Sequence, residues 1–175
     1  GFPHGAIHTE FKVAESERAI ADGCEELDMV VNISQVKTGN WSYVCDDIKA
    51  VVDVTHAASR KVKVIFENCY LTDDEKVQLC RICTDAGADW VKTSTGFGTG
   101  GATLDDLKLM VNNTPDHVQV KAAGGVRNFE KLKLVRDLGV TRCGASATKI
   151  MLDECRKQLD LQPIDVSDGT ANSGY

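Results

Sequence analysis

Residues 120–126, VKAAGGV, combine an apolar strand with a lysine and a pair of glycines. The stretch 89–97, DWVKTSTGF, repeats this arrangement with apolar residues, a lysine, a small polar turn and a glycine. A strand that enters a protein core does not carry an ammonium group without a reason. The glycines indicate that another group approaches the backbone closely at these points. Two such strand ends in one chain favour a shared site over chance.

Elsewhere the pattern of apolar residues alternates between helix and strand. Amphipathic patterns predict helices over 10–23, 41–59, 72–88, 103–111, 128–139 and 147–159, and short apolar runs predict strands over 26–33, 61–67, 89–94, 117–122 and 141–146. We expect Asn40, Thr72, Thr103 and Asn128 to cap helices. The expected inward residues are Phe11, Val13, Ala14 and Ile20 in the first helix and Val44, Ile48, Val51, Val52 and Ala58 in the second.

Repeated βα units predict an α/β fold with a parallel sheet, either a barrel or an open doubly wound sheet. A TIM (β/α)8 barrel has eight strands and about 250 residues, whereas this chain has 175 residues and five predicted strands. We therefore expect either a smaller open fold or a barrel that lacks its N-terminal strands in this chain. The barrel domain is predicted over 1–161, and the polar segment 162–175 is expected to be a flexible tail.

Charge and composition restrict the partners and the compartment. The net charge is −6 and no block of basic residues occurs, which argues against a nucleic-acid partner. No apolar run is long enough to cross a bilayer, so no membrane partner is expected. Seven cysteines are an odd count, which favours a reducing cytoplasm over a disulfide framework. Cys80 and Cys83 form a CxxC, which we interpret as two small residues on a half-buried helix face.

Lys92 and Lys121 occupy matching positions at the polar ends of two predicted strands. An apolar floor disfavours the charged form of a lysine, and a second ammonium nearby acts in the same direction. One amine could then attack a carbonyl, whereas the alternative is that each lysine extends to water. Asp28 interrupts the apolar run 26–33 and could either transfer protons or only neutralise the lysines. Glu67 ends a strand and could line the pocket or be solvated.

Glycine-rich turns follow three of the predicted strands, at 96–101, 124–125 and 144–146. Each turn precedes a predicted helix, so backbone N–H groups and helix N-termini would together form a cradle for a phosphate. Such cradles recur after the last strands of barrels. The sequence therefore predicts a phosphorylated ligand beside the two lysines.

With these motifs the chain resembles the deoxyribose-phosphate aldolases, which are class I aldolases on a TIM barrel. The resemblance rests on GFPHG at 1–5, DMVVN at 28–32, KVIFENCYLT at 63–72, ADWVKTSTGFGTGGAT at 88–103, VKAAGGVRN at 120–128 and GASAT at 144–148. It implies reversible cleavage of 2-deoxy-D-ribose 5-phosphate to acetaldehyde and glyceraldehyde 3-phosphate, without metal or organic cofactor. It also implies a small phosphorylated sugar as substrate and a homodimer or homotetramer.

The resemblance also implies roles for individual residues. Lys121 matches the lysine that forms the Schiff base, Lys92 the lysine that lowers its pKa, and Asp28 the carboxylate of the proton relay. Tyr175 matches a C-terminal tyrosine that assists proton transfer in some members. The phosphate and substrate site corresponds to Thr95, Gly96, Gly124, Gly125, Val126, Arg127, Gly144 and Ser146.

This sequence departs from the family pattern in a few places. Phe97 and Ala147 stand where some members have lysine and serine, and Ala122 stands where proline or serine is common. The strands that precede GFPHG in the family are not part of this chain. Two other interpretations remain: a different phosphate-handling barrel enzyme such as an isomerase, and a truncated, non-catalytic sugar-phosphate-binding paralogue.

Overall fold

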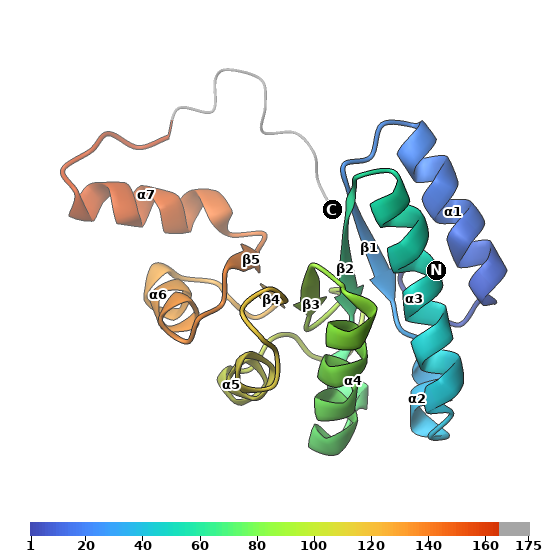
Figure 1. Cartoon of the computed structure of the whole chain (residues 1–175). Coiled ribbons are helices and arrows are strands. Elements are labelled where there is room, and N and C mark those ends of the chain that lie inside the picture. Colours follow the sequence, from blue (N-terminus) through green and yellow to red (C-terminus); the bar gives the residue numbers. More distant parts are fainter. Residues whose placement is uncertain (165–175) are drawn as a thin grey trace.

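The computed structural model describes residues 1–164, and in these residues helices and strands alternate along the chain (Figure 1). The elements in chain order are α1 (Thr9–Ala21), β1 (Glu26–Val30), α2 (Ile33–Lys37), α3 (Trp41–Ala57), β2 (Lys61–Ile65), the 3-10 helix η1 (Asn68–Tyr70), α4 (Asp73–Ala86), β3 (Trp90–Lys92), α5 (Leu104–Asn112), β4 (Gln119–Ala123), α6 (Phe129–Asp137), β5 (Arg142–Gly144) and α7 (Thr148–Gln158).

The described strands form one parallel sheet in the order β1-β2-β3-β4-β5. Each strand pairs with the next in sequence, so every connection is a crossover through a helix. Figure 1 shows the helices along the outer side of the curved sheet, with α3, α4 and α5 following one another around it. The α/β class and the (β/α) barrel arrangement are confirmed, here with five strands in the described part of the chain.

The two faces of the sheet differ in chemistry because side chains alternate along each strand. The outward face packs against the helices and is apolar, with Val62, Val64, Val91 and Val120 each at most 2% exposed. Register places charged residues together on the concave face, where Asp28 pairs with Lys63 and Lys92 pairs with Lys121. The core therefore lies between sheet and helices, and the concave face is left for polar groups.

Three of the four predicted N-cap residues form side-chain capping hydrogen bonds. Thr72 forms a capping box with Glu75, and Thr103 and Asn128 each accept a hydrogen bond from the backbone three residues later. Asn40 occupies the N-cap position of α3 as predicted, but its side chain makes no capping hydrogen bond and donates to Gln35.

The expected apolar face of the first helix is only partly buried, since Val13 and Ile20 are half-buried and Ala14 is exposed. In α1 the buried side chains are Lys12 and Ser16, whereas Phe11 is 57% exposed. Lys12 is buried because its ammonium pairs with Asp47 of α3 at 2.5 Å and donates to a backbone carbonyl of β1. Periodicity cannot foresee this, since the partner is contributed by another helix. Ala58 was likewise expected inside, but it follows the last turn of α3 and is exposed.

The strands are shorter than predicted because polar turns begin directly after them. Asn32 accepts a hydrogen bond from Gln35 and starts the short helix α2, which ends the run predicted over 26–33. The 3-10 helix η1 begins at Asn68, soon after β2 ends at Ile65. In the described residues no helix has the length and apolarity needed to span a bilayer. All seven cysteines are free, and Cys80 and Cys83 are buried in α4.

Candidate active site

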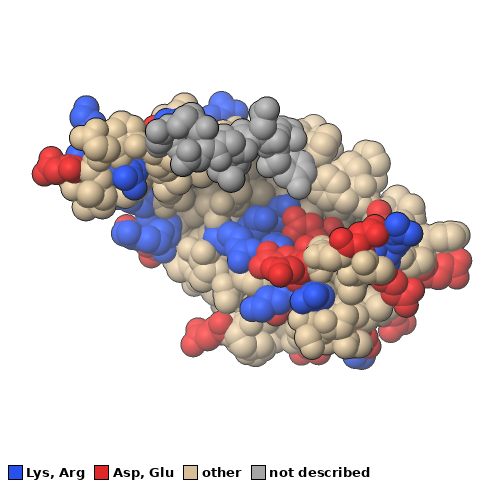
Figure 2. All heavy atoms as spheres, turned by 90° about the horizontal axis from the view of Figure 1, so that it is seen from above, with Lys and Arg blue, Asp and Glu red and all other residues tan. Residues whose placement is uncertain are grey.

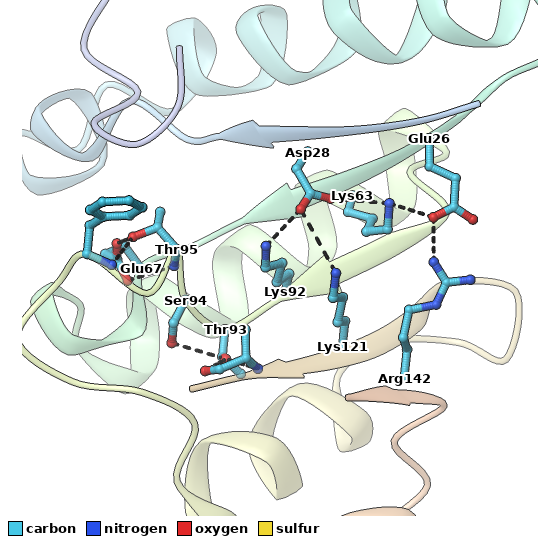
Figure 3. Close-up of polar contacts among 12 residues, drawn as sticks. Glu26, Asp28, Lys63, Glu67, Lys92, Thr93, Ser94, Thr95, Lys121 and Arg142 are labelled. Carbon is cyan, nitrogen blue, oxygen red and sulfur yellow. Dashed lines mark hydrogen bonds and ion pairs between the residues drawn. The ribbon is translucent and has the colours of Figure 1, made fainter. Parts of the chain in front are cut away.

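Lys92 and Lys121 lie side by side on the concave face because β3 and β4 pair in register at these two residues. Lys92 is the last residue of β3, and Lys121 is in the middle of β4. Both ammonium groups approach the same oxygen of Asp28 from β1: Lys92 Nζ lies 2.8 Å from Oδ2, and Lys121 Nζ lies 4.0 Å from it (Figure 3). The structure thus brings together the three residues that the sequence singled out.

Asp28 is surrounded by more cations than it can neutralise. Its Oδ2 accepts the hydrogen bond from Lys92, and Lys63 Nζ lies 3.2 Å from its Oδ1. That second contact lacks hydrogen-bonding geometry, so Oδ1 is buried without a hydrogen-bond donor among the described residues. Burial raises the pKa of Asp28, but the hydrogen bond from Lys92 and the nearby lysine charges together outweigh burial and lower it. Asp28 is therefore an anion, and its Oδ2 is the oxygen that both Lys92 and Lys121 approach.

Lys121 has the electrostatic surroundings of an amine that gives up its proton. Desolvation is the largest influence and lowers its pKa, and Asp28 opposes this. The charges of Lys92, Lys63 and Arg142 act in the same direction as desolvation, so the pKa of Lys121 lies below its ordinary value. A neutral amine is the form that can add to a carbonyl.

Three charged residues of this face carry no role in the sequence prediction: Glu26, Lys63 and Arg142. Lys63 comes from β2 and is buried, with its ammonium 2.8 Å from Glu26 Oε2. Arg142 from β5 donates to the same oxygen at 2.5 Å. The signal for Lys63 was available, since it is a charge inside a predicted strand, as Asp28 is. The contacts that join Glu26 to Arg142 span 116 positions of sequence and left no local signal.

Glu67 holds the turn that follows Lys92. Its carboxylate accepts hydrogen bonds from the backbone N–H and the hydroxyl of Thr95. The residue is 3% exposed and has a left-handed backbone with φ 58°, a conformation that a non-glycine residue adopts only where its surroundings impose it. Of the two interpretations left open by the sequence, the solvated one is excluded, and Glu67 fixes the loop from within.

The glycine turns after β3 and β4 meet at close range. Gly124 and Gly125 have φ of 74° and 78°, and Gly96 has φ of 95°. A Cβ at Gly101 would lie 2.7 Å from the backbone carbon of Gly124, so only glycine fits there. Gly144 ends β5 beside Lys121, and a Cβ there would lie 3.6 Å from Lys121 Cε. The turns and the lysines therefore share one end of the sheet.

Other residues of the predicted phosphate site are placed unequally. Ser146 and Arg127 are exposed at turns that precede α7 and α6, where a ligand could meet them. Val126 is 2% exposed and belongs to the apolar core, so its side chain is not available to a phosphate and only its backbone could contribute. Tyr175 and residues 165–175 of the predicted tail lie outside the described residues. In residues 1–164 no group of His, Cys, Asp or Glu side chains is arranged to hold a metal ion.

Comparison with known proteins gives the family. Residues 2–147 match the DeoC/LacD family aldolase. The chain belongs to this aldolase family. A protein named deoxyribose-phosphate aldolase from Rhodopirellula baltica is 60% identical over 175 residues, which are 100% of this chain and 72% of that protein.

Solved structures of the family share the fold. The structure titled "QR15, an Aldolase" has a TM-score of 0.84 at 36% identity, covering 93% of this chain and 73% of that one. A tetrameric deoxyribose phosphate aldolase from Aeropyrum pernix has a TM-score of 0.79 at 30% identity, covering 91% of this chain and 66% of that one. This chain therefore corresponds to the larger part, and not the whole length, of the family members it matches.

Proposed function

We propose that the protein is a class I deoxyribose-phosphate aldolase that cleaves 2-deoxy-D-ribose 5-phosphate reversibly to acetaldehyde and glyceraldehyde 3-phosphate. The observation that carries this proposal is the pair of lysines in register, both within 4.0 Å of one carboxylate oxygen. The family match and the name of the Rhodopirellula relative support it over the non-catalytic paralogue.

The proposed reaction uses only side chains of this face. A neutral lysine amine adds to the substrate aldehyde carbon and water leaves, which gives an iminium. The iminium accepts the electron pair of the breaking C–C bond, and an enamine of acetaldehyde remains on the lysine. The hydroxyl proton of the departing glyceraldehyde 3-phosphate goes to Asp28, directly or through water. Protonation of the enamine and hydrolysis of the resulting imine release acetaldehyde and restore the amine.

The glycine turns supply the phosphate end of the proposed site. The backbone N–H groups of Gly96, Gly124, Gly125 and Val126 and the side chains of Arg127 and Ser146 would hold the phosphate, with Thr95 and Gly144 beside the sugar. Holding one end of the substrate aligns its carbonyl with the amine, which is a large source of rate enhancement. Glu67 keeps Thr95 and its turn in place.

Two assignments of the lysine roles are supported by different observations. The lowered pKa of Lys121 favours it as the nucleophile, with Lys92 as the neighbouring cation, which is the assignment that the family resemblance implies. The reverse assignment rests on geometry, because Lys92 lies at hydrogen-bond distance from Asp28, which can accept the proton that the amine loses. Lys121 Nζ lies farther from this oxygen, at 4.0 Å.

Trapping with acetaldehyde and sodium borohydride tests the function and separates the two assignments. Reduction should leave a two-carbon adduct on Lys121 or Lys92, located by mass spectrometry of peptides. Each of Lys92→Met and Lys121→Met should lower kcat/KM by more than about a thousandfold, and the variant that lacks the nucleophile should form no adduct. An adduct confined to other lysines, or full activity of both variants, would rule out the proposal.

Assembly and compartment belong to the same proposal. The tetramer reported for the Aeropyrum pernix protein supports a homotetramer, with a homodimer as the simpler form. Light scattering of the purified protein distinguishes these states from a monomer. Free thiols at all seven cysteines are compatible with a cytoplasmic location, which fractionation of cells would test.

A further inference from the structure

A second charged group lies on the concave face, beside the lysine pair. It consists of Glu26, Lys63, Trp90 and Arg142, which we call the inner cluster. Glu26 Oε2 lies 2.8 Å from Lys63 Nζ and 2.5 Å from Arg142 Nη1, so one oxygen holds two cations (Figure 3). Figure 2 shows Lys and Arg atoms beside Asp and Glu atoms in a hollow in the middle of this side of the molecule.

Trp90 provides the apolar surface on which these cations lie. The Arg142 guanidinium carbon is 4.4 Å and Lys63 Nζ is 5.7 Å from the ring centroid. The ring is 4% exposed, so it is covered on the concave side by charged groups. Since β1 and β5 are the outer strands of the described sheet, the contact between Glu26 and Arg142 also joins its two ends across this surface.

Lys63 connects the inner cluster to Asp28 and through it to the lysine pair. Its ammonium is 2.8 Å from Glu26 and 3.2 Å from Asp28 Oδ1. Its side chain is only 5% exposed, so the charge cannot turn to water. The two carboxylates therefore compete for Lys63, and its shorter ion pair with Glu26 keeps it from binding Asp28 fully.

Positive charges outnumber negative ones on the concave face, so the competition for Lys63 affects the lysine pair. The groups that face Lys63 and the lysine pair are Glu26 and Asp28 from β1, Lys61 from β2, Lys92 from β3, Lys121 from β4 and Arg142 from β5. Five cations face two carboxylates in this set, so the loss of either carboxylate would make it harder for the lysines to keep their protons. Hydrogen bonds from Arg142 and then Lys63 lower the pKa of Glu26 to about 2, so it remains an anion at neutral pH.

We propose that Glu26 is a positioning residue for the aldolase reaction, which holds Lys63 and Arg142 so that Asp28 remains available to Lys92 and Lys121. The inference rests on the proposed Schiff-base function. Without the Glu26 carboxylate, Lys63 would bind Asp28 Oδ1, turn this carboxylate from the lysine pair and leave the face more positive by one charge.

The test compares Glu26→Gln with Arg142→Gln in the full-length protein. Loss of Glu26 removes a negative charge, so the reactive amine loses its proton more readily and the acidic limb of kcat/KM moves to lower pH. Loss of Arg142 removes a positive charge, so the limb moves to higher pH. We expect each shift to be roughly 0.5 to 1 pH unit. In Glu26→Gln, kcat should also fall, by up to about a hundredfold through misplacement of Asp28, with KM changed little.

Controls separate positioning from general damage to the fold. Arg142→Lys keeps the charge and should restore most of the profile, which also serves if Glu26→Gln does not fold. Asp47→Asn breaks a buried ion pair away from the concave face and should leave the pH profile in place. The same pH series of acetaldehyde trapping reports on the amine itself.

The outcomes distinguish this inference from the proposed function. Opposite shifts in Glu26→Gln and Arg142→Gln support it. Shifts of the same sign, or none, in proteins that still form the acetaldehyde adduct overturn it and leave the aldolase function standing. Absence of the adduct in the unsubstituted protein would overturn the function and this inference together.

Discussion

Two buried lysine–aspartate pairs in this chain differ in how completely they are satisfied. Lys12 and Asp47 are 2% and 1% exposed and lie 2.5 Å apart. Lys12 also donates to the carbonyl of Val30, and Thr9 donates to the other oxygen of Asp47. The Lys12 ammonium and both oxygens of Asp47 therefore have partners. This ion pair joins α1, α3 and β1 and leaves no group free to react.

The pair of Lys92 and Asp28 has the opposite character. Asp28 is 31% exposed and is shared with Lys121 and Lys63, and its Oδ1 accepts no hydrogen bond from the described residues. An excess of cations around one accessible carboxylate favours proton transfer, whereas a closed pair favours stability. The comparison teaches that the same two residue types serve structure or chemistry according to the number of partners.

Removing the charge of Asp28, in the pair with Lys92, should have the largest effect on activity. Asp28→Asn removes the proton acceptor between the lysines, so we expect kcat to fall by about a hundredfold to ten-thousandfold. Asparagine keeps an oxygen that can accept the hydrogen bond from Lys92, and Lys63 keeps its ion pair with Glu26, so the fold should persist. Steady-state cleavage of 2-deoxy-D-ribose 5-phosphate and circular dichroism measure the two properties. Unchanged kcat would mean that Asp28 only balances charge.

The same change of aspartate to asparagine in the pair of Lys12 and Asp47 should lower stability and not activity. Asp47→Asn leaves the Lys12 ammonium buried without a counter-charge, which costs about 3 to 5 kcal/mol of unfolding free energy. Any folded protein should keep its kcat, because Asp47 does not face the lysine pair. Urea denaturation and the same cleavage assay decide this. A loss of kcat in the folded variant, comparable to that of Asp28→Asn, would break the comparison.

A smaller effect should appear in the stability of the protein at acidic pH, to which Glu26 of the inner cluster contributes. The pKa of Glu26 is lowered from 4.5 to about 2, so the stability it contributes is complete above pH 4.5 and is lost as the pH falls towards 2. Glu26→Gln removes this contribution at all pH values. The difference in urea midpoint between the unsubstituted protein and Glu26→Gln should therefore shrink between pH 5 and about pH 3. A difference that stays constant over this range would show that the ion pairs of Glu26 add nothing.

The sequence predicted most of the elements and the centre of the site, for an identifiable reason. Asp28, Lys92 and Lys121 stand out because each is a charge within an apolar strand, and such a charge needs partners. The glycines at 124 and 125 stand out because turns with positive φ need them. Thr72 and Glu75 identify the start of α4 through a motif that is complete within four residues.

What the sequence did not reveal depends on partners far away along the chain. Lys63 is visible as a charge inside a predicted strand, but its partners Asp28 and Glu26 come from another strand, so the sequence does not show what it binds. Lys12 occupies a position that helical periodicity assigns to solvent, but Asp47 of another helix draws it inside. The role of Glu67 cannot be chosen from the sequence, because its partner Thr95 lies 28 positions away.

The alternation of helices and strands, the parallel sheet and the three charged strand residues Asp28, Lys92 and Lys121 can all be recognised in the sequence. These follow from periodicity and from single charges in apolar runs, which are local properties. Which cations share which carboxylate depends on the fold, because register and sheet curvature bring β1 to β5 together on one face. Electrostatic interactions depend on distance in space, and that distance is set by the fold and not by separation along the chain.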